Sequence, residues 1–196
     1  MDKETRLHLA LDMLKEVIDR DVEIPLKTFG LSMRPSIRGG EWIVVRRAGT
    51  EEMNVGDVVI YQAGNTFVAH RVIRKRDHDG RLYLTVKGDA HLAAEGEIAA
   101  REVVAKVVAL RKADKMIDLN HPRWRLANRL IALYSSWVDT LYRGVPFLHG
   151  ILRRGGDRPW GRLVIRLVSG LNRLPTRLLI GSWEMAMRQS ETPQAR

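Results

Sequence analysis

Three residue types that together support nucleophilic catalysis occur in order along this chain, as Ser32, His70 and Asp89. Ser32 lies in a turn-forming segment, two residues after Gly30 and three before Pro35. Such a turn can expose one hydroxyl beside backbone N–H groups that bind an oxyanion. We therefore predict Ser32 as the nucleophile and His70 as its general base, with Asp89 holding the imidazole. The backbone at Ser32 and Gly30 is the predicted oxyanion hole.

Each of these residues also has a purely structural interpretation. Ser32 could cap a turn, and His70 could be a core histidine with satisfied hydrogen bonds. Asp89 could belong to a turn or form an ion pair with Arg71. Lys87 supplies a nearby amine and is a second candidate for the base. These alternatives remain open on the residue pattern alone.

Four short motifs surround the three residues and occur in a fixed order. They read SMRPSI at 32–37, GDVV at 56–59, HRVI at 70–73 and KGD at 87–89. Together they resemble the motif boxes of type I signal peptidases, in the superfamily of serine peptidases that also contains the self-cleaving regulators of the SOS response. The resemblance spans residues 24–110. Bacterial signal peptidases usually carry Lys where this chain has His70, so the chain resembles the His-using archaeal and endoplasmic-reticulum branch.

The resemblance implies a serine endopeptidase that cleaves leader or signal peptides without a cofactor. It also implies a peptide or preprotein substrate with small residues at the first and third positions before the cut. Members of the family carry a second acidic position after the KGD motif, and Glu95 is the candidate here, with Glu in place of the usual Asp. We predict no metal site, because the histidines show no His-x-x-x-His spacing.

The beginning of the sequence departs from the family, whose members usually have an N-terminal membrane anchor. The first six residues are mostly charged, and no uncharged apolar run of 18 or more residues occurs in the sequence. We therefore expect no signal peptide and no spanning helix. The expected location is cytoplasmic or at the periphery of a membrane.

Charge divides the chain near residue 120. Residues 1–120 hold 20 basic and 19 acidic side chains, whereas residues 121–196 hold 13 arginines and 4 acidic residues. The whole chain has a net charge of +10. An Arg-rich segment favours an anionic membrane surface as partner, with nucleic acid or another acidic partner as weaker alternatives. A solvated helical face remains the structural interpretation. The chain has no cysteine, which excludes disulfides and a thiol nucleophile.

Hydrophobic periodicity predicts a helix over residues 3–19 and a change to short strands after residue 23. The predicted strands are Ile24–Phe29, Trp42–Arg46, Asp57–Gln62, Phe67–Arg74, Leu82–Val86 and Glu102–Leu110. Loops at 63–65 and 77–80 are predicted hairpin turns. The fold class is thus a mainly β peptidase domain, antiparallel or mixed and barrel-like, over residues 23–120.

We expect residues 1–22 to form an N-terminal helix and the Arg-rich region, 121–196, to form a basic helical appendage to the β domain. Two helical patterns occur in the Arg-rich region. The first pattern places apolar residues on one helical face, at Leu126, Leu130, Leu133, Trp137 and Leu141. The second covers about 162–179. Both can lie in a membrane interface or pack on the β domain.

Two other functions compete with a leader peptidase. A self-cleaving regulator of the SOS type is disfavoured, because the pairs Ala48-Gly49 and Ala63-Gly64 follow Ser32, whereas those proteins cut upstream of the serine and usually use Lys as base. The other alternative is an inactive peptidase-like module that binds peptides or polyanions through its Arg-rich half.

Overall fold

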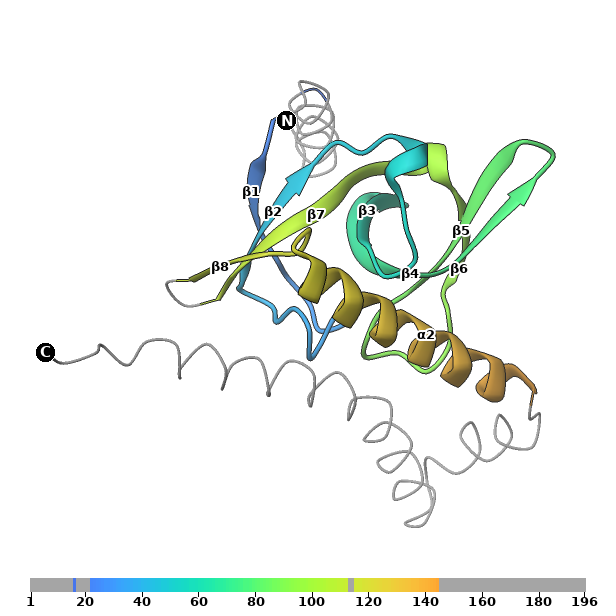
Figure 1. Ribbon diagram of the computed structural model, residues 1–196. Helices are drawn as coiled ribbons and strands as arrows, with labels where there is room; N and C mark the ends of the chain where they lie inside the picture. The colour runs from blue at the N-terminus through green and yellow to red at the C-terminus, as the bar shows by residue number, and fades with distance from the viewer. Residues whose placement is uncertain (1–15, 17–21, 113–114, 145–196) are drawn as a thin grey trace, which may run out of the picture.

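One antiparallel sheet and one long helix make up the described part of the chain in this computed structural model (Figure 1). The structure describes residue 16, residues 22–112 and residues 115–144. The predicted helices over 3–19 and 162–179 lie outside these ranges, apart from residue 16. The prediction of a mainly β fold followed by a helix is confirmed.

Eight strands, two 3₁₀ turns and a helix follow one another in the sequence. They are β1 (Ile24–Lys27), β2 (Trp42–Arg46), η1 (Thr50–Glu52), β3 (Val58–Ala63), β4 (Thr66–His78), β5 (Arg81–Lys87), β6 (Gly96–Ala99), η2 (Ala100–Glu102), β7 (Val103–Lys112), β8 (Lys115–Asp118) and α2 (Pro122–Gly144). The six predicted strands correspond to β1, β2, β3, β4, β5 and β7. The short strands β6 and β8 were not predicted.

The strand order β1-β2-β7-β3-β4-β5-β6 shows that the sheet does not close into a barrel, so the barrel-like expectation needs correction. The two ends of this order, β1 and β6, have only four residues each and do not pair with one another. The long strand β7 pairs with β2, β3 and β8 along its length and so joins the two halves of the sheet.

Both predicted hairpin turns are present. Strand β3 ends at Ala63 and β4 begins at Thr66, and Gly64 has a positive φ of 58°. Between β4 and β5, Asp79 and Gly80 have φ values of 52° and 72°. Two successive left-handed residues are the requirement of a type I′ turn, which joins twisted antiparallel strands with two residues.

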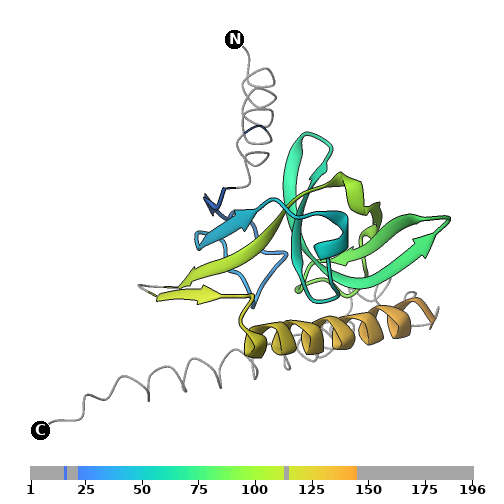
Figure 2. The same ribbon diagram turned by 45° about the horizontal axis from the view of Figure 1, so that its top comes forward.

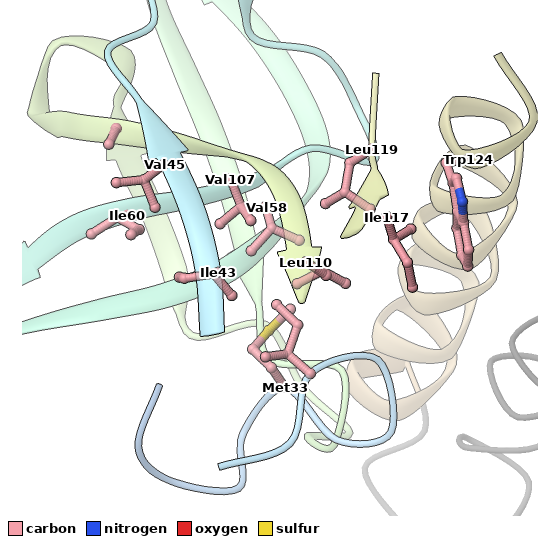
Figure 3. Packing of buried hydrophobic residues seen from close by; sticks show 12 residues of the cluster. Met33, Ile43, Val45, Val58, Ile60, Val107, Leu110, Ile117, Leu119 and Trp124 are labelled. Carbon is pink, nitrogen blue, oxygen red and sulfur yellow. The ribbon is translucent and has the colours of Figure 1, made fainter. Parts of the chain in front are cut away.

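The larger core cluster joins the Ser32 turn, the sheet and the helix (Figure 3). Met33 contributes from the turn, Val107 from β7 and Trp124 from α2, and all three are less than one-tenth exposed. Because Trp124 belongs to this core, the boundary at residue 120 does not detach α2 from the β domain.

Helix α2 lies along one side of the sheet (Figure 2) and has a buried face of mixed polarity and an exposed apolar face. Its buried residues are Trp124, Ile131, Ala132, Ser135 and Asp139. The exposed face carries the five apolar residues that the sequence placed together, Leu126, Leu130, Leu133, Trp137 and Leu141, each at least 42% exposed. Among the described helices, none is long and apolar enough to cross a bilayer.

Candidate active site

The turn that carries Ser32 connects β1 to β2 and is held by backbone contacts. Gly30 has a φ of 91°, a conformation that favours glycine. A Cβ at Gly39 would stand 2.7 Å from the Gly30 carbonyl oxygen, so these two glycines allow the chain to pass over itself. The N–H of Ile37 donates to the Met33 carbonyl at 3.0 Å, which closes the turn after the serine.

Ser32 itself is half-buried. Within residues 22–112 and 115–144, neither its hydroxyl nor its backbone N–H has a hydrogen-bond partner. A nucleophile and an oxyanion donor both require groups that are not already committed to hydrogen bonds.

The KGD segment lies directly against this turn. The Ala90 N–H donates to the Ser32 carbonyl at 2.8 Å. A Cβ at Gly88 would stand 2.8 Å from the same oxygen and 3.2 Å from the Ser32 Cβ, so only glycine fits there without displacing the serine. The first and last of the four motifs thus meet in space, although about 55 residues separate them in sequence.

His70 occupies the middle of β4 and is 2% exposed. Its Nδ1 lies 2.9 Å from the Tyr61 hydroxyl and 3.1 Å from Glu95 Oε2. Burial lowers the pKa of His70 below its usual value, and the nearby Glu95 carboxylate opposes that shift only in part. The imidazole is therefore neutral at pH 7. With the Nδ1 proton directed at the carboxylate, the Nε2 lone pair can accept a proton.

Tyr61 reinforces this arrangement. Burial, together with the charge of Glu95, raises the pKa of Tyr61 to about 12. Its hydroxyl stays protonated at any physiological pH and supplies a permanent donor beside the imidazole and the carboxylate.

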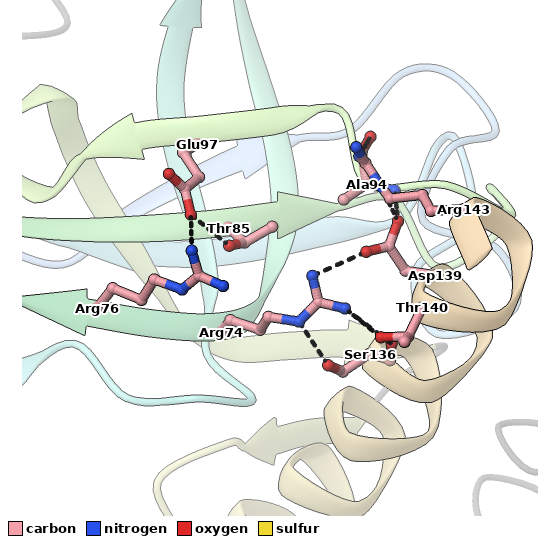
Figure 4. A network of polar contacts seen from close by, with 9 residues as sticks. All are labelled: Arg74, Arg76, Thr85, Ala94, Glu97, Ser136, Asp139, Thr140 and Arg143. Atoms are coloured by element: carbon pink, nitrogen blue, oxygen red, sulfur yellow. Dashed lines mark hydrogen bonds and ion pairs between the residues drawn. The ribbon is translucent and has the colours of Figure 1, made fainter.

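Helix α2 fixes the loop that carries Glu95 (Figure 4). The Ala94 N–H donates to Asp139 Oδ1 at 2.7 Å, and Arg143 donates to the Ala94 carbonyl at 3.0 Å. Arg74 of β4 completes an ion pair with Asp139 at 2.9 Å. Although burial raises the pKa of Asp139, these hydrogen bonds and cations outweigh it and hold the pKa below its usual value. An ionised residue of α2 therefore positions the neighbour of Glu95.

Asp89 belongs to a buried network with Arg71 and Ser36, and its charge also acts on His70. Its carboxylate accepts two hydrogen bonds of 2.8 Å from Arg71 and one from the Ser36 hydroxyl. Arg71 also donates to the Gly56 carbonyl and to Asn128 of α2. The ion pair between Asp89 and Arg71, one of the alternatives considered for Asp89 from the sequence, is therefore present. The carboxylate in contact with His70 Nδ1 is that of Glu95, the secondary acidic candidate, whereas Asp89 pairs with Arg71.

Lys87, the second candidate base, is 1% exposed and its Nζ has no hydrogen-bond partner in the described structure. Burial lowers the pKa of Lys87 to about 8, and the carboxylates of Asp89 and Asp139 oppose the shift. A proton acceptor must reach the hydroxyl it activates. The charges that act on the amine are those of Asp89, Asp139 and Arg71, whereas His70 packs against His91. The His91 Nδ1 lies 3.1 Å from the position of a Cβ added at Gly88, and that position lies 3.2 Å from the Ser32 Cβ.

His91 is the residue that the sequence interpretation missed. Its Nδ1 lies 2.7 Å from Glu95 Oε1, and its ring centroid lies 6.0 Å from that of His70. The ligand atoms of His70, His91 and Glu95 all lie within 4.8 Å of one another, so these three could hold a metal ion. The signal was a His-x-x-x-Glu spacing, which a search for paired histidines does not detect.

A cavity of about 210 Å³ opens beside Ser32. Its lining comes from the turn and from the start of β4: Thr28, Phe29, Gly30, Ser32, Met33, Ile37, Arg38, Gly39, Thr66, Phe67, Val68 and Ala69. Larger cavities, of about 520 and 760 Å³, lie elsewhere and include neither Ser32 nor His70 in their lining. The cavity at Ser32 is lined by the candidate nucleophile, although His70 is not part of its lining.

The sequence was also compared with known proteins. It matches no model of a protein family, and a search of curated proteins found no match.

Proposed function

We propose that this chain is a serine endopeptidase of the signal-peptidase type, with Ser32 as nucleophile, His70 as general base and Glu95 as the carboxylate that orients the base. One observation carries the proposal. A buried imidazole contacts the Glu95 carboxylate through Nδ1, and the Ser32 carbonyl accepts a hydrogen bond from Ala90, the residue before His91 of the same cluster. That is the arrangement of a nucleophile, base and orienting acid, defined by geometry rather than by sequence order.

The chemistry follows from the protonation states. Ser32 Oγ attacks the scissile carbonyl carbon while its proton passes to Nε2 of His70, and the carbonyl oxygen becomes an oxyanion beside the Ser32 N–H. Glu95 stabilises the imidazolium formed. Collapse of the intermediate breaks the C–N bond, and His70 gives its proton to the leaving amine. Water then repeats the sequence on the acyl-serine ester and regenerates the hydroxyl.

The cavity beside Ser32 supports a peptide substrate with short side chains. Its volume of about 210 Å³ is below the range of about 300–1,000 Å³ that typical small-molecule sites occupy. Phe29 and Leu31, which flank the turn, are 86% and 60% exposed and offer apolar contacts. Among the described strands β1 pairs with β2 alone and ends the sheet order, so an extended peptide can add to its other edge. We propose leader peptides with small residues before the cut.

The test is cleavage of a diverse peptide library, analysed by mass spectrometry, with the wild type, Ser32→Ala and His70→Ala. We expect cleavage by the wild type alone, with small residues at the first and third positions before the cut. The self-cleaving alternative predicts spontaneous cleavage of the purified chain at an Ala-Gly bond. If the folded wild type cleaves neither the library nor itself, the peptide-binding module becomes the better account.

The exposed face of α2 favours a membrane surface as the working place of this peptidase. Besides its apolar stripe it exposes Arg123, Arg125, Arg129 and Arg143, while its one acidic residue, Asp139, is fully buried. A helix whose exposed charges are all cations, beside an apolar stripe, suits an anionic lipid interface. We propose that α2 docks on anionic lipid.

Co-sedimentation with vesicles tests this docking. Vesicles containing phosphatidylserine should bind the wild type, and purely zwitterionic vesicles should bind it far less. The double variant Leu133→Ser and Trp137→Ser should weaken binding by about tenfold, because two exposed apolar anchors are lost. Met116→Ser, which removes an exposed apolar side chain from β8, is the matched control. Equal binding by all three proteins would contradict the docking proposal.

A further inference from the structure

The metal-binding atoms of His70, His91 and Glu95 lie close together in the candidate site. Glu95 extends one carboxylate oxygen to within 2.7 Å of His91 Nδ1 and the other to within 3.1 Å of His70 Nδ1. All the ligand atoms of the set lie within 4.8 Å of one another. Two imidazole nitrogens and a carboxylate are thus gathered in one small volume.

This donor set matches zinc. Imidazole and carboxylate are common zinc ligands, and two histidines with one glutamate leave a fourth tetrahedral position for water or substrate. With metal–ligand bonds of about 2.0 Å, neighbouring ligand atoms of a tetrahedral site lie about 3.3 Å apart. The two measured contacts are already close to that separation. We propose that His70, His91 and Glu95 bind one Zn²⁺ ion.

The segment that supplies two of the three ligands is held in place before any ion binds. The His91 N–H donates to the Gly88 carbonyl at 3.0 Å, and the Glu95 N–H donates to Val86 at 3.1 Å. Such backbone contacts orient ligands in advance, as supporting hydrogen bonds do in metal sites. Entry is open, because the side chains of His91 and Glu95 are 46% and 36% exposed while His70 forms the buried end of the site.

Bound zinc switches the peptidase off, a consequence that rests on the proposed function. The ion takes the Nδ1 lone pair of His70, so the ring proton must then sit on Nε2, and that nitrogen can no longer accept the proton of Ser32. The same ion takes the Glu95 carboxylate away from its orienting role. A peptidase of this design is active as the metal-free protein and inhibited by zinc.

The first experiment is isothermal titration calorimetry of the metal-free full-length chain with zinc chloride. We expect one ion per chain, and at least tenfold weaker binding by His91→Ala because a ligand is lost. His78→Ala removes an exposed histidine outside the cluster and should bind like the wild type. Histidine ¹⁵N NMR spectra should show the Nδ1 signals of His70 and His91 shifting together. Absence of a one-to-one site, or unchanged binding by folded His91→Ala, would overturn the zinc site.

Activity is measured separately on the same proteins. Zinc should inhibit peptide cleavage by the wild type, and His91→Ala should resist inhibition at the same concentration. Stimulation by zinc, or inhibition of His91→Ala equal to that of the wild type, would overturn the inhibitory role. A protein that binds one zinc through these residues and cleaves nothing when metal-free would sustain the zinc site and refute the proposed function.

Discussion

Two neighbouring residues of β4, His70 and Arg71, face opposite sides of the sheet, and each has a carboxylate partner. Both side chains are at most 2% exposed. Arg71 meets Asp89 through two parallel hydrogen bonds, and that carboxylate is 1% exposed. His70 meets Glu95 through one contact, and Glu95 is 36% exposed. Under the proposed function, similar pairings serve a scaffold on one side and chemistry on the other.

The two pairs differ in their hydrogen-bond geometry and in their exposure to solvent. A guanidinium that donates in a fork to a fully buried carboxylate holds both groups in one arrangement and keeps both charged. A histidine with one contact to a partly exposed carboxylate can gain and lose a proton while its partner remains solvated. The segment from Lys87 to Glu95 joins the two sides, so the buried network places the reactive cluster.

The largest expected effect comes from breaking the scaffold side. Arg71→Leu leaves Asp89 charged and buried without its partner, and should lower the free energy of unfolding by about 3–5 kcal/mol. Urea denaturation measures this loss. Arg76→Leu, on the same strand, removes an exposed partner of Glu97 and should change stability by less than about 0.5 kcal/mol. Equal effects of the two variants would contradict the scaffold role.

The contact between the two sides is tested by Gly88→Ala. The added Cβ would stand 2.8 Å from the Ser32 carbonyl oxygen, so the turn must move, at a cost of about 1–3 kcal/mol and with a fall in cleavage rate of at least tenfold. Gly49→Ala, whose new Cβ would meet nothing closer than 4.0 Å, should leave both quantities unchanged. Full activity of Gly88→Ala would show that the serine is placed by something else.

The amine of Lys87 has no hydrogen-bond partner among the described residues, and it allows the buried side to be tested through pH. Its pKa is about 8 in the folded chain against 10.5 in the unfolded chain, so the unfolded chain binds more protons between these values. Stability should therefore rise as the pH increases from about 8 to 10.5. Lys87→Met should abolish that rise and stabilise the protein at pH 7 by about 1–2 kcal/mol. Cleavage should persist, whereas its loss in a folded Lys87→Met protein would support the amine as base.

The smallest effect is expected from Tyr61→Phe. The change removes one hydroxyl beside His70 and should cost about 0.5–1.5 kcal/mol of stability, as for a single buried hydrogen bond. The cleavage rate should fall by less than tenfold, because Glu95 still holds the imidazole. Thermal unfolding and initial-rate measurements check both quantities. A rate loss as large as that of His70→Ala would instead place the Tyr61 hydroxyl in the reaction.

The strands could be predicted from the sequence. Which of the two acidic residues, Asp89 or Glu95, contacts Arg71 and which contacts His70 could not be predicted. Alternating apolar runs gave six strands, whereas β6 and β8, of four residues each, carry too few residues to show a period. Asp89 and Glu95 are both acids near His70 in the fold, and composition does not say which one Arg71 takes. Tertiary pairing decided that question.

In helix α2, too, the sequence predicts the element but not the contacts of its polar residues. Its apolar stripe is regular enough to predict a helix, but the stripe lies on the exposed side. The buried side includes Ser135 and the ionised Asp139, whose partners come from β4 and from the loop before Glu95. A polar residue buried by distant partners carries no periodic signal, so its role in placing the site was not predictable.

The most direct measurement of the central claim is the cleavage rate per folded molecule for Glu95→Gln beside Asp89→Asn, with the free energy of unfolding of each. The account predicts that Glu95→Gln keeps its stability within about 1 kcal/mol and loses at least about 100-fold in rate, as expected when an orienting carboxylate is neutralised. Asp89→Asn should lose about 3 kcal/mol or more of stability and less than tenfold in rate. The opposite pattern would contradict the assignment and return the imidazole-holding role to Asp89.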